Sequence, residues 1–292
     1  DRGISGQRYD NNGSPVGTEF LVNTHTQSRQ EDADVSGLND GGFVVVWESK
    51  DDATGDSDKE GIAGQRYDAV GNKVGTEFLV NTNTHKEQEE PDIAGLTGGG
   101  FVVVWETKAN NNEDDGKGIA AQRYDASGNK IGTEFLINTF TNHDQEDPSV
   151  SSTTDGGFIV VWESKDSATG DNDGEGIAAQ RFDVNGNKVS SEILINTLTQ
   201  EDQEEAEVAG LVNGGFIVVW ESENTANGDD SKYGIAGRIF PDSDNDGYED
   251  LYDAYPDDPT RRTLDAVPGI VLSLQYDGSN HSTLVNWASY DD

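Results

Sequence analysis

A five-residue phrase recurs five times along this 292-residue chain, at intervals of 57 or 58 residues. It reads Gly-Ile-Ser/Ala-Gly/Ala-Gln/Arg, and its copies begin at Gly3, Gly61, Gly118, Gly176 and Gly234. Each of the first four copies leads into a Glu-Phe/Ile-Leu-Val/Ile-Asn-Thr segment, an acidic stretch and Gly-Gly-Phe-Val/Ile-Val-Val-Trp-Glu. A regular period of this size is typical of repeat architectures, whose single units cannot bury their apolar faces alone. The period therefore constrains the fold more than any other feature.

One repeat unit, residues 90–138, predicts four short strands separated by turns rich in glycine. The second strand is apolar on both of its alternating faces, which indicates a strand buried on both sides. The four expected strands are Pro91–Leu96, Phe101–Trp105, Gly118–Asp125 and Gly132–Asn138.

The repeat predicts an all-β fold, because no segment has a helical period. Four antiparallel strands in about 58 residues fit one blade of a β-propeller. A strand that is apolar on both faces suits a blade packed between two neighbouring blades. A β-helix has shorter coils, and a string of separate sandwiches would need more residues in each unit.

The two ends of the chain decide the expected number of blades. The segment 283–292 aligns without gaps on 43–52, so that Trp287 takes the place of Trp47, and 269–276 can be its partner strand. We therefore expect 263–292 to supply the first two strands of a degenerate fifth blade. The N-terminal segments 3–10 and 19–23 would supply its last two strands, which closes the ring without an open edge.

Five blades are favoured and four are possible, in which case 263–292 begins another domain. The expected organisation is propeller blades over 1–241, an Asp-rich insertion or linker over 242–262, and ring-completing strands over 263–292.

Charge and composition limit the partners. Asp and Glu number 57 against 19 Lys and Arg, which gives a formal charge of −38. Such a field repels nucleic acid and anionic membranes and attracts cations. The absence of cysteine excludes disulfides, and no apolar run approaches the length of a membrane span. The chain begins with Asp and shows no signal peptide, so we expect a processed protein or a piece of a longer one.

Acidic residues cluster in two places in each repeat, before the first strand and after the Trp-containing strand. In a propeller these two connections emerge on the same face, so one face is expected to be strongly negative and a candidate for ligand and metal. The first set is 30–32, 87–90, 144–147 and 201–205, and the second falls within 51–58, 113–115, 166–173 and 229–230.

An arginine also recurs in the third strand of each repeat. We expect these arginines to form cross-strand ion pairs with the Glu that follows each Trp. The arginines are Arg8, Arg66, Arg123, Arg181 and Arg238, and the glutamates are Glu48, Glu106, Glu163 and Glu221.

The most specific local motif lies outside the repeats, in 242–253. Oxygen-bearing residues stand at loop positions 1, 3, 5, 7, 9 and 12, with Gly247 at position 6, which is the spacing of an Asp-rich Ca²⁺ loop. Position 12 is Asp rather than the longer Glu, which makes that ligand the least certain. The predicted calcium ligands are Asp242, Asp244, Asp246, Tyr248, Asp250 and Asp253.

Two stretches resemble known families. The segment 242–259 resembles a thrombospondin type 3 calcium repeat of the kind found in large secreted proteins of marine bacteria. Residues 3–240 resemble the tandem repeats of giant bacterial surface proteins and adhesins, in which Gly-Gly-Phe-Val-Val-Val-Trp and Gly-Gln-Arg-Tyr-Asp phrases recur. The resemblance implies an extracellular or cell-surface setting and names no ligand.

These observations favour an extracellular, calcium-dependent binding or adhesion module that recognises glycans through a repeated acidic face. Repeated weak sites would gain from multivalency. The alternative is a structural spacer or filament subunit of a large surface protein, with other copies of the protein as partners. A glycoside-active enzyme is disfavoured, because catalysis needs two carboxylates in different environments, whereas near-identical blades place equivalent acids in similar surroundings. No catalytic residue is therefore predicted.

Overall fold

The computed structural model describes the propeller repeats and parts of the C-terminal region. The described residues are 2–50, 55–56, 60–108, 116–141, 143–165, 170–171, 174–223, 233–244, 249–251, 257, 274–275 and 284–285. Within these ranges, no helix is long and apolar enough to cross a membrane.

Three complete four-stranded antiparallel sheets follow one another along the chain, and we call them blades A, B and C. In each blade the four strands pair in their sequence order. Blade A consists of β3 (Gln30–Gly37), β4 (Phe43–Ser49), β5 (Gly61–Tyr67) and β6 (Lys73–Leu79). Blade B consists of β7 (Gln88–Gly95), β8 (Phe101–Thr107), β9 (Gly118–Tyr124) and β10 (Lys130–Leu136). Blade C consists of β11 (Gln145–Ser152), β12 (Phe158–Ser164), β13 (Gly176–Phe182) and β14 (Lys188–Leu194).

Three smaller sheets complete the described part of the chain. A two-stranded sheet of β1 (Ser5–Tyr9) and β2 (Pro15–Leu21) precedes blade A. The three-stranded sheet that follows blade C, which we call blade D, consists of β15 (Gln203–Gly210), β16 (Phe216–Ser222) and β17 (Gly234–Phe240). Near the C-terminus, β18 (Leu274–Gln275) pairs with β19 (Leu284–Val285).

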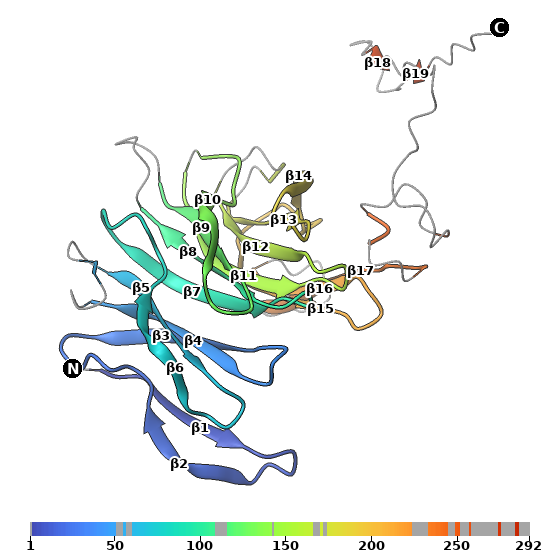
Figure 1. Ribbon diagram of the computed structural model, residues 1–292. Coiled ribbons are helices and arrows are strands. Elements are labelled where there is room, and N and C mark those ends of the chain that lie inside the picture. The colour runs from blue at the N-terminus through green and yellow to red at the C-terminus, as the bar shows by residue number, and fades with distance from the viewer. Residues whose placement is uncertain are drawn as a thin grey trace, which may run out of the picture.

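The blades fan out around their first strands, as in a propeller (Figure 1). The first strands contact one another in the order β3, β7, β11, β15. They form the inner wall, and the fourth strands lie outermost. The described strands therefore form a propeller arc from β1 to β17.

Apolar side chains pack between neighbouring blades rather than within one blade. One cluster joins Val44 and Ile62 of blade A to Val103 and Trp105 of blade B. All seven residues of β8 are buried, so the prediction of a strand buried on both faces is confirmed. The four strands expected within one repeat are also confirmed, with boundaries shifted by up to three residues.

Each buried tryptophan of blades A to D has a dedicated hydrogen-bond acceptor. The Trp105 Nε1 group donates to Gln88 Oε1 at 2.9 Å, and the partners lie 17 residues apart. The same pair recurs as Trp47–Gln30, Trp162–Gln145 and Trp220–Gln203. Because a buried N–H without a partner is destabilising, this glutamine is a structural part of the repeat.

The predicted cross-strand pairs between arginine and glutamate are wrong. Arg66 lies opposite Val44, whereas Glu48 lies opposite Ile62 near the other end of the same strand pair. The Arg66 guanidinium reaches instead to the next blade and donates to the carbonyl oxygens of Ala126 and Ser127, at 3.0 and 2.5 Å. The arginine therefore joins neighbouring blades.

Arg238 does not occupy the position of the other arginines. It lies opposite Val218, in the register that Gln65 has opposite Val45, and Ile239 takes the arginine position. Arg238 donates to the Ile195 carbonyl oxygen at 3.0 Å. Blade D therefore lacks two side chains that the third strands of blades A to C share. One is the glutamine at this register position, and the other is the arginine that contacts the next blade.

Candidate functional site

Each inner strand begins with a β-bulge that carries an acidic residue in the left-handed backbone region. The register shifts within the first residues of β3, β7, β11 and β15. A bulge inserts one extra residue and re-aims its side chain. We call the four bulge residues the axial ring: Asp32 (φ 47°), Glu90 (φ 47°), Asp147 (φ 47°) and Glu205 (φ 52°).

A second tier lies two residues further along each inner strand, and it joins the strands to one another. The Asp34 carboxylate accepts a hydrogen bond from the Ile93 N–H at 3.2 Å, and Asp92 accepts one from Val150 N–H at 2.7 Å. The Ser149 hydroxyl donates to Glu207 Oε2 at 2.9 Å. Inner strands have an unpaired edge toward the axis, and these side chains satisfy some of its N–H groups. The second tier is therefore at least partly structural.

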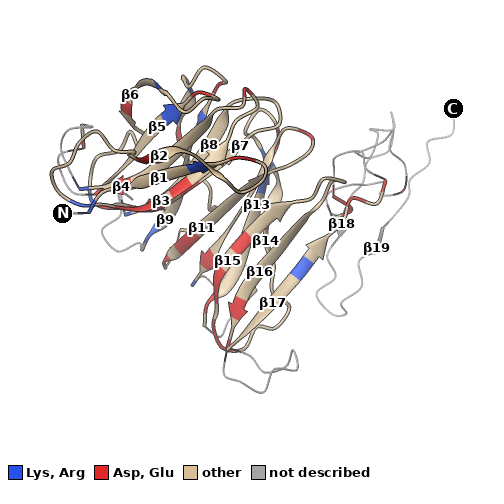
Figure 2. Cartoon of the chain, turned by 90° about the horizontal axis from the view of Figure 1, so that it is seen from below, with Lys and Arg blue, Asp and Glu red and all other residues tan. Residues whose placement is uncertain are grey.

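Two cavities open between the inner strands, and both are lined mainly by carboxylates. One cavity of about 270 Å³ is lined by Glu90, Asp147 and Glu205 of the axial ring and by second-tier residues. The other, of about 390 Å³, is lined by Asp32, Glu90 and Asp147 together with charged residues at the mouth. Figure 2 shows acidic segments on β3, β11 and β15. Carboxylates from successive repeats thus converge on one region.

The carboxylates of this region have different proton affinities. Partial desolvation in the cavity wall and then the charges of Asp32 and Asp147 raise the pKa of Glu90 to about 7, although its side chain still reaches solvent. Burial and then a hydrogen bond to Asp34 raise the pKa of Asp92 far above its ordinary range. Near pH 7, Glu90 and Asp92 therefore retain protons that a fully solvated carboxylate would have lost.

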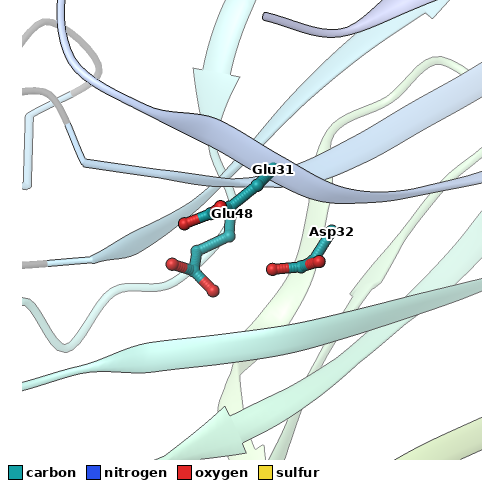
Figure 3. A group of neighbouring side chains, drawn as sticks. All are labelled: Glu31, Asp32 and Glu48. Atoms are coloured by element: carbon teal, nitrogen blue, oxygen red, sulfur yellow. The ribbon is translucent and has the colours of Figure 1, made fainter. Parts of the chain in front are cut away.

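At the mouth, acidic residues of β3 and β4 meet a cationic side chain. The carboxylates of Glu31, Asp32 and Glu48 point toward one another (Figure 3), with one oxygen of each within 4.8 Å of the others. Burial raises the pKa of Glu48 to about 7, and Lys50 opposes this shift. The Lys50 Nζ group lies 3.5 Å from Glu48 and 3.7 Å from Glu31.

A similar acidic group is formed by Glu146, Glu163 and Glu175 in blade C. Lys165 Nζ lies 2.5 Å from Glu146 and 3.2 Å from Glu175. Both groups have the geometry to hold a metal ion, but lysine already supplies positive charge to each. We therefore interpret them as ion-pair networks.

The structure describes part of the predicted calcium segment. Asp242 is buried, and its carboxylate lies over Gly214, where a Cβ atom would be 1.9 Å from Asp242 Oδ2. Asp250 accepts hydrogen bonds from the Ser243 N–H at 2.7 Å and from the Ser243 hydroxyl at 2.6 Å. Ser243 and Asp250 thus join the two described ends of the loop. Asp244 is also described, whereas Asp246, Tyr248 and Asp253 lie outside the described residues.

Most of the acidic residues predicted after the Trp-containing strands also lie outside the described residues. The structure describes two residues of that acidic set, Asp56 and Asp171, and both are buried. The Asn81 side-chain amide donates to Asp56 at 2.8 Å, and that of Asn196 donates to Asp171 at 2.7 Å. These two carboxylates therefore tie a loop to the end of a fourth strand.

The fold and the cavities together define a propeller-type protein with an acidic site where its inner strands converge. No protein-family model and no curated protein matches the sequence. Among solved structures, an endo-arabinase from Bacteroides thetaiotaomicron is similar in fold, with 14% identity, a TM-score of 0.48, and 78% of this chain and 81% of that chain covered.

Two further arabinanases are similar to the same extent. An exo-1,5-α-L-arabinanase from a bovine ruminal metagenomic library has 11% identity and a TM-score of 0.45, with 84% of this chain and 88% of that chain covered. An α-L-arabinanase from Penicillium chrysogenum has 14% identity and a TM-score of 0.45, with 71% and 58% covered. At this identity the likeness concerns the fold.

The expectation of a non-enzymatic adhesion module or spacer is corrected. The three solved structures reported above are named as an endo-arabinase and two arabinanases and not as adhesion proteins. The argument against catalysis assumed that equivalent carboxylates have equivalent surroundings. That assumption does not hold for the glutamate after the tryptophan, because Lys117 lies beside Glu106 in blade B, whereas Glu175 lies beside Glu163 in blade C.

Sequence reasoning placed the axial ring within the first acidic set but missed the second tier. Asp34, Asp92, Ser149 and Glu207 stand at one repeat position and differ in residue type. Polar variation at a position inside an otherwise repeated strand is a signal that could have identified them.

Proposed function

We propose that this protein is a glycoside-active enzyme whose carboxylates in the axial ring cleave a bound sugar chain. The observation that carries the proposal is the convergence of Asp32, Glu90, Asp147 and Glu205 from four repeats on one pair of cavities, where the pKa of Glu90 is raised to about 7. Glycoside hydrolysis requires a carboxylic acid that protonates the leaving oxygen and a carboxylate that activates water or attacks the sugar.

Glu90 is the proposed proton donor. With its pKa raised to about 7, it keeps a proton near neutral pH and can transfer it to a glycosidic oxygen. The charges that help to raise this pKa belong to Asp32 and Asp147, which are the proposed base or nucleophile. Glycoside hydrolysis needs one protonated and one ionised carboxylate, and the raised pKa of Glu90 suits the protonated role.

The first prediction is that Glu90→Gln abolishes hydrolysis. The purified full chain is tested on a panel of neutral polysaccharides that includes arabinan, and reducing ends are measured as a function of pH. General acid catalysis contributes about 10²- to 10⁴-fold, so we expect kcat to fall by at least about 10²-fold. Glu201→Gln, in an exposed loop away from the cavities, is the matched control and should retain activity.

Two outcomes would refute the proposal. One is a folded wild-type protein that releases no reducing ends from any member of the panel. The other is a Glu90→Gln variant as active as Glu201→Gln, with an unchanged acidic-to-neutral pH profile.

We further propose that the Asp-rich segment binds Ca²⁺, that the protein acts outside a bacterial cell, and that the propeller has five blades. Support for calcium is the ligand spacing in the sequence, together with the hydrogen bonds that join Ser243 to Asp250 across the loop. The extracellular setting rests on the resemblance to bacterial surface-protein repeats. The five-blade ring rests on the alignment of 283–292 with 43–52.

A further inference from the structure

Two of the four axial-ring residues, Glu90 and Asp147, differ from the other two. Glu90 and Asp147 line both cavities, whereas Asp32 and Glu205 line one cavity each. A proline follows each of the first two residues, whereas an alanine follows Asp32 and Glu205. Because proline has a fixed φ, it restricts the chain next to the bulge. These differences favour Glu90 and Asp147 as the two carboxylates that act together.

The bulge that carries Asp147 is held by a glutamate of the preceding blade. The Asp147 N–H donates to Glu106 Oε1 at 2.9 Å, and Glu106 is 2% exposed. Asp147 is half-buried, and its φ of 47° lies in the left-handed region, which residues other than glycine populate sparsely. Such a conformation persists where the surrounding structure holds it. Glu106 thus restrains the backbone from which the Asp147 carboxylate projects.

Lys117, which directly precedes β9, holds Glu106 and the residues that lead to the bulge. Its Nζ group lies 2.6 Å from Glu106 Oε2 and 2.9 Å from Glu146 Oε1. Its backbone N–H donates to the Asp144 carboxylate at 2.9 Å, and its carbonyl oxygen accepts a hydrogen bond from the Gln145 N–H at 3.1 Å. Three consecutive residues before the bulge are therefore fastened to Lys117.

Only blade B has a lysine at this position of the repeat. The residues just before the Gly-Ile phrase in blades A to D are Glu60, Lys117, Glu175 and Tyr233. In blade C the Glu205 N–H donates to Glu163 Oε1 at 2.5 Å, so the contact with the bulge recurs there. Glu175, and not a lysine, is hydrogen-bonded to Glu163 in that blade. The combination of a glutamate on the bulge N–H and a lysine from this position is therefore specific to Asp147.

We propose that Glu106 and Lys117 are positioning residues, which hold Asp147 as the base or nucleophile that acts with Glu90. This role rests on the proposed function, and it gives Asp147 rather than Asp32 the part opposite the proton donor. Glu106 and Lys117 also line the larger cavity, where the two oxygens of Glu106 are engaged by the Asp147 N–H and by Lys117. We therefore expect both residues to act through Asp147.

The charge of Lys117 also suits this role of Asp147. Burial and then the charge of Glu146 raise the pKa of Asp147, and the charge of Lys117 opposes that rise. A carboxylate that acts as base or nucleophile has to be ionised. Lys117 therefore favours the form of Asp147 that the proposed reaction uses.

Substitutions of Glu106 test the positioning role through kcat and KM. Glu106→Leu removes the acceptor of the Asp147 N–H, and kcat should fall by about 10²-fold on the polysaccharide that the wild type cleaves, because misplacing a reacting group by about 1 Å has an effect of that size. KM should stay within about twofold, since the contacts that bind substrate remain. Glu106→Gln keeps an oxygen acceptor, so it should retain more activity than Glu106→Leu.

Glu163→Leu is the matched control, because it removes the same contact one blade further on. Glu163 is 5% exposed, close to the 2% of Glu106, so each substitution leaves a bulge N–H without its buried acceptor. Glu163→Leu should nevertheless leave kcat near the wild-type value, since Glu205 is neither the proposed donor nor the proposed base or nucleophile. Lys117→Met is the milder variant if Glu106→Leu does not fold, and it should also lower kcat.

Hydrogen exchange at the Asp147 amide provides a readout that needs no enzymatic activity. The amide should exchange faster in Glu106→Leu than in the wild type, and it should keep its protection in Glu163→Leu. Unchanged protection in Glu106→Leu would show that Glu106 does not hold the bulge.

The kinetic results distinguish the positioning role from the proposed function. In an active enzyme, an unchanged kcat in Glu106→Leu, or an equal loss in Glu163→Leu, overturns the positioning role and leaves the proposed function standing. An unchanged kcat in Lys117→Met overturns the role of Lys117. A wild-type protein that is inactive on the whole polysaccharide panel refutes the proposed function, and the role of Asp147 with it.

Discussion

One position in the repeat places opposite charges beside the glutamate that follows the tryptophan in blades B and C. The residue just before the Gly-Ile phrase is Lys117 in blade B, and its Nζ group lies 2.6 Å from Glu106. In blade C the same position is Glu175, which is hydrogen-bonded to Glu163. Burial and then the charge of Asp147 raise the pKa of Glu163 far above its ordinary range. In blade B the hydrogen bond from Lys117 opposes the effect of burial on the pKa of Glu106.

This difference predicts how stability depends on pH. Glu163 has a raised pKa in the folded state, so the folded protein binds more protons than the unfolded chain once pH exceeds the ordinary carboxylate range. Its contribution to stability is complete below that range and is lost as pH rises through the folded-state pKa. Glu163→Gln cannot ionise, so its melting temperature should fall less than that of the wild type between pH 5 and pH 9.

Thermal melts across this pH range provide the measurement. Other carboxylates with raised pKa values, such as Glu48 and Glu90, keep part of the pH dependence in the variant. Glu201→Gln, at an exposed loop carboxylate, should follow the wild-type curve. Parallel curves for Glu163→Gln and the wild type would show that Glu163 does not carry this dependence.

At the scale of strands and turns, contacts between blades use the turn that joins the third and fourth strands. Arg123 of β9 is 9% exposed and donates to the carbonyl oxygen of Val184 at 2.5 Å and to that of Asn185. Arg66 makes the equivalent contacts with the turn of blade B. The turn of one blade is thus held by the third strand of the preceding blade, which explains why the arginine and the turn recur together.

Removing one of these contacts should weaken the interface between two blades. Hydrogen bonds to charged groups contribute about 1.5–3 kcal/mol each, so we expect Arg123→Met, which removes two of them, to lower the free energy of unfolding by about 3 kcal/mol or more. Arg8→Met, whose contacts with Ala69 and Val70 are exposed, should lower it less. Urea denaturation with comparison of m-values is the measurement, and equal losses in both variants would contradict the role of burial.

At the scale of the whole molecule, the Asp-rich segment is fastened to blade C by a buried ion pair. Arg181 is fully buried, and its Nε group lies 2.6 Å from Glu249 and its Nη2 group 3.2 Å from Asp155. Arg181 is the blade C counterpart of Arg123, so it holds the segment that replaces the usual turn of blade D. The conformation of this segment and the packing of blade C against blade D therefore depend on each other.

Calcium binding should consequently stabilise the whole propeller and not the segment alone. A ligand at 100 times its Kd adds about 2.7 kcal/mol to the free energy of unfolding. We expect Ca²⁺ to raise the melting temperature and a chelator to lower it, while Asp246→Asn reduces the difference. Mg²⁺ at the same concentration is the control cation. Identical melts with Ca²⁺ and with chelator would refute the calcium proposal.

The repeat unit could be predicted from the sequence because its signals are local. Strands such as Phe101–Thr107 follow from apolar runs between glycine-rich turns, and both are properties of neighbouring residues. The arginine contacts could not be predicted in this way. Arg66 and Glu48 stand in paired strands, but the register sets them four positions apart, and the observed partner of Arg66 lies about one repeat further along the chain.

The sequence alone determined that this protein is built from repeated four-stranded units, since a period of 57 or 58 residues admits few folds. The tertiary structure alone decided where the chemistry lies. Packing of successive blades brings Asp32, Glu90, Asp147 and Glu205 together from distant parts of the chain, and proton affinity depends on the burial and charges that result. Burial and charge at this site arise between repeats, so they cannot be read from any one of them.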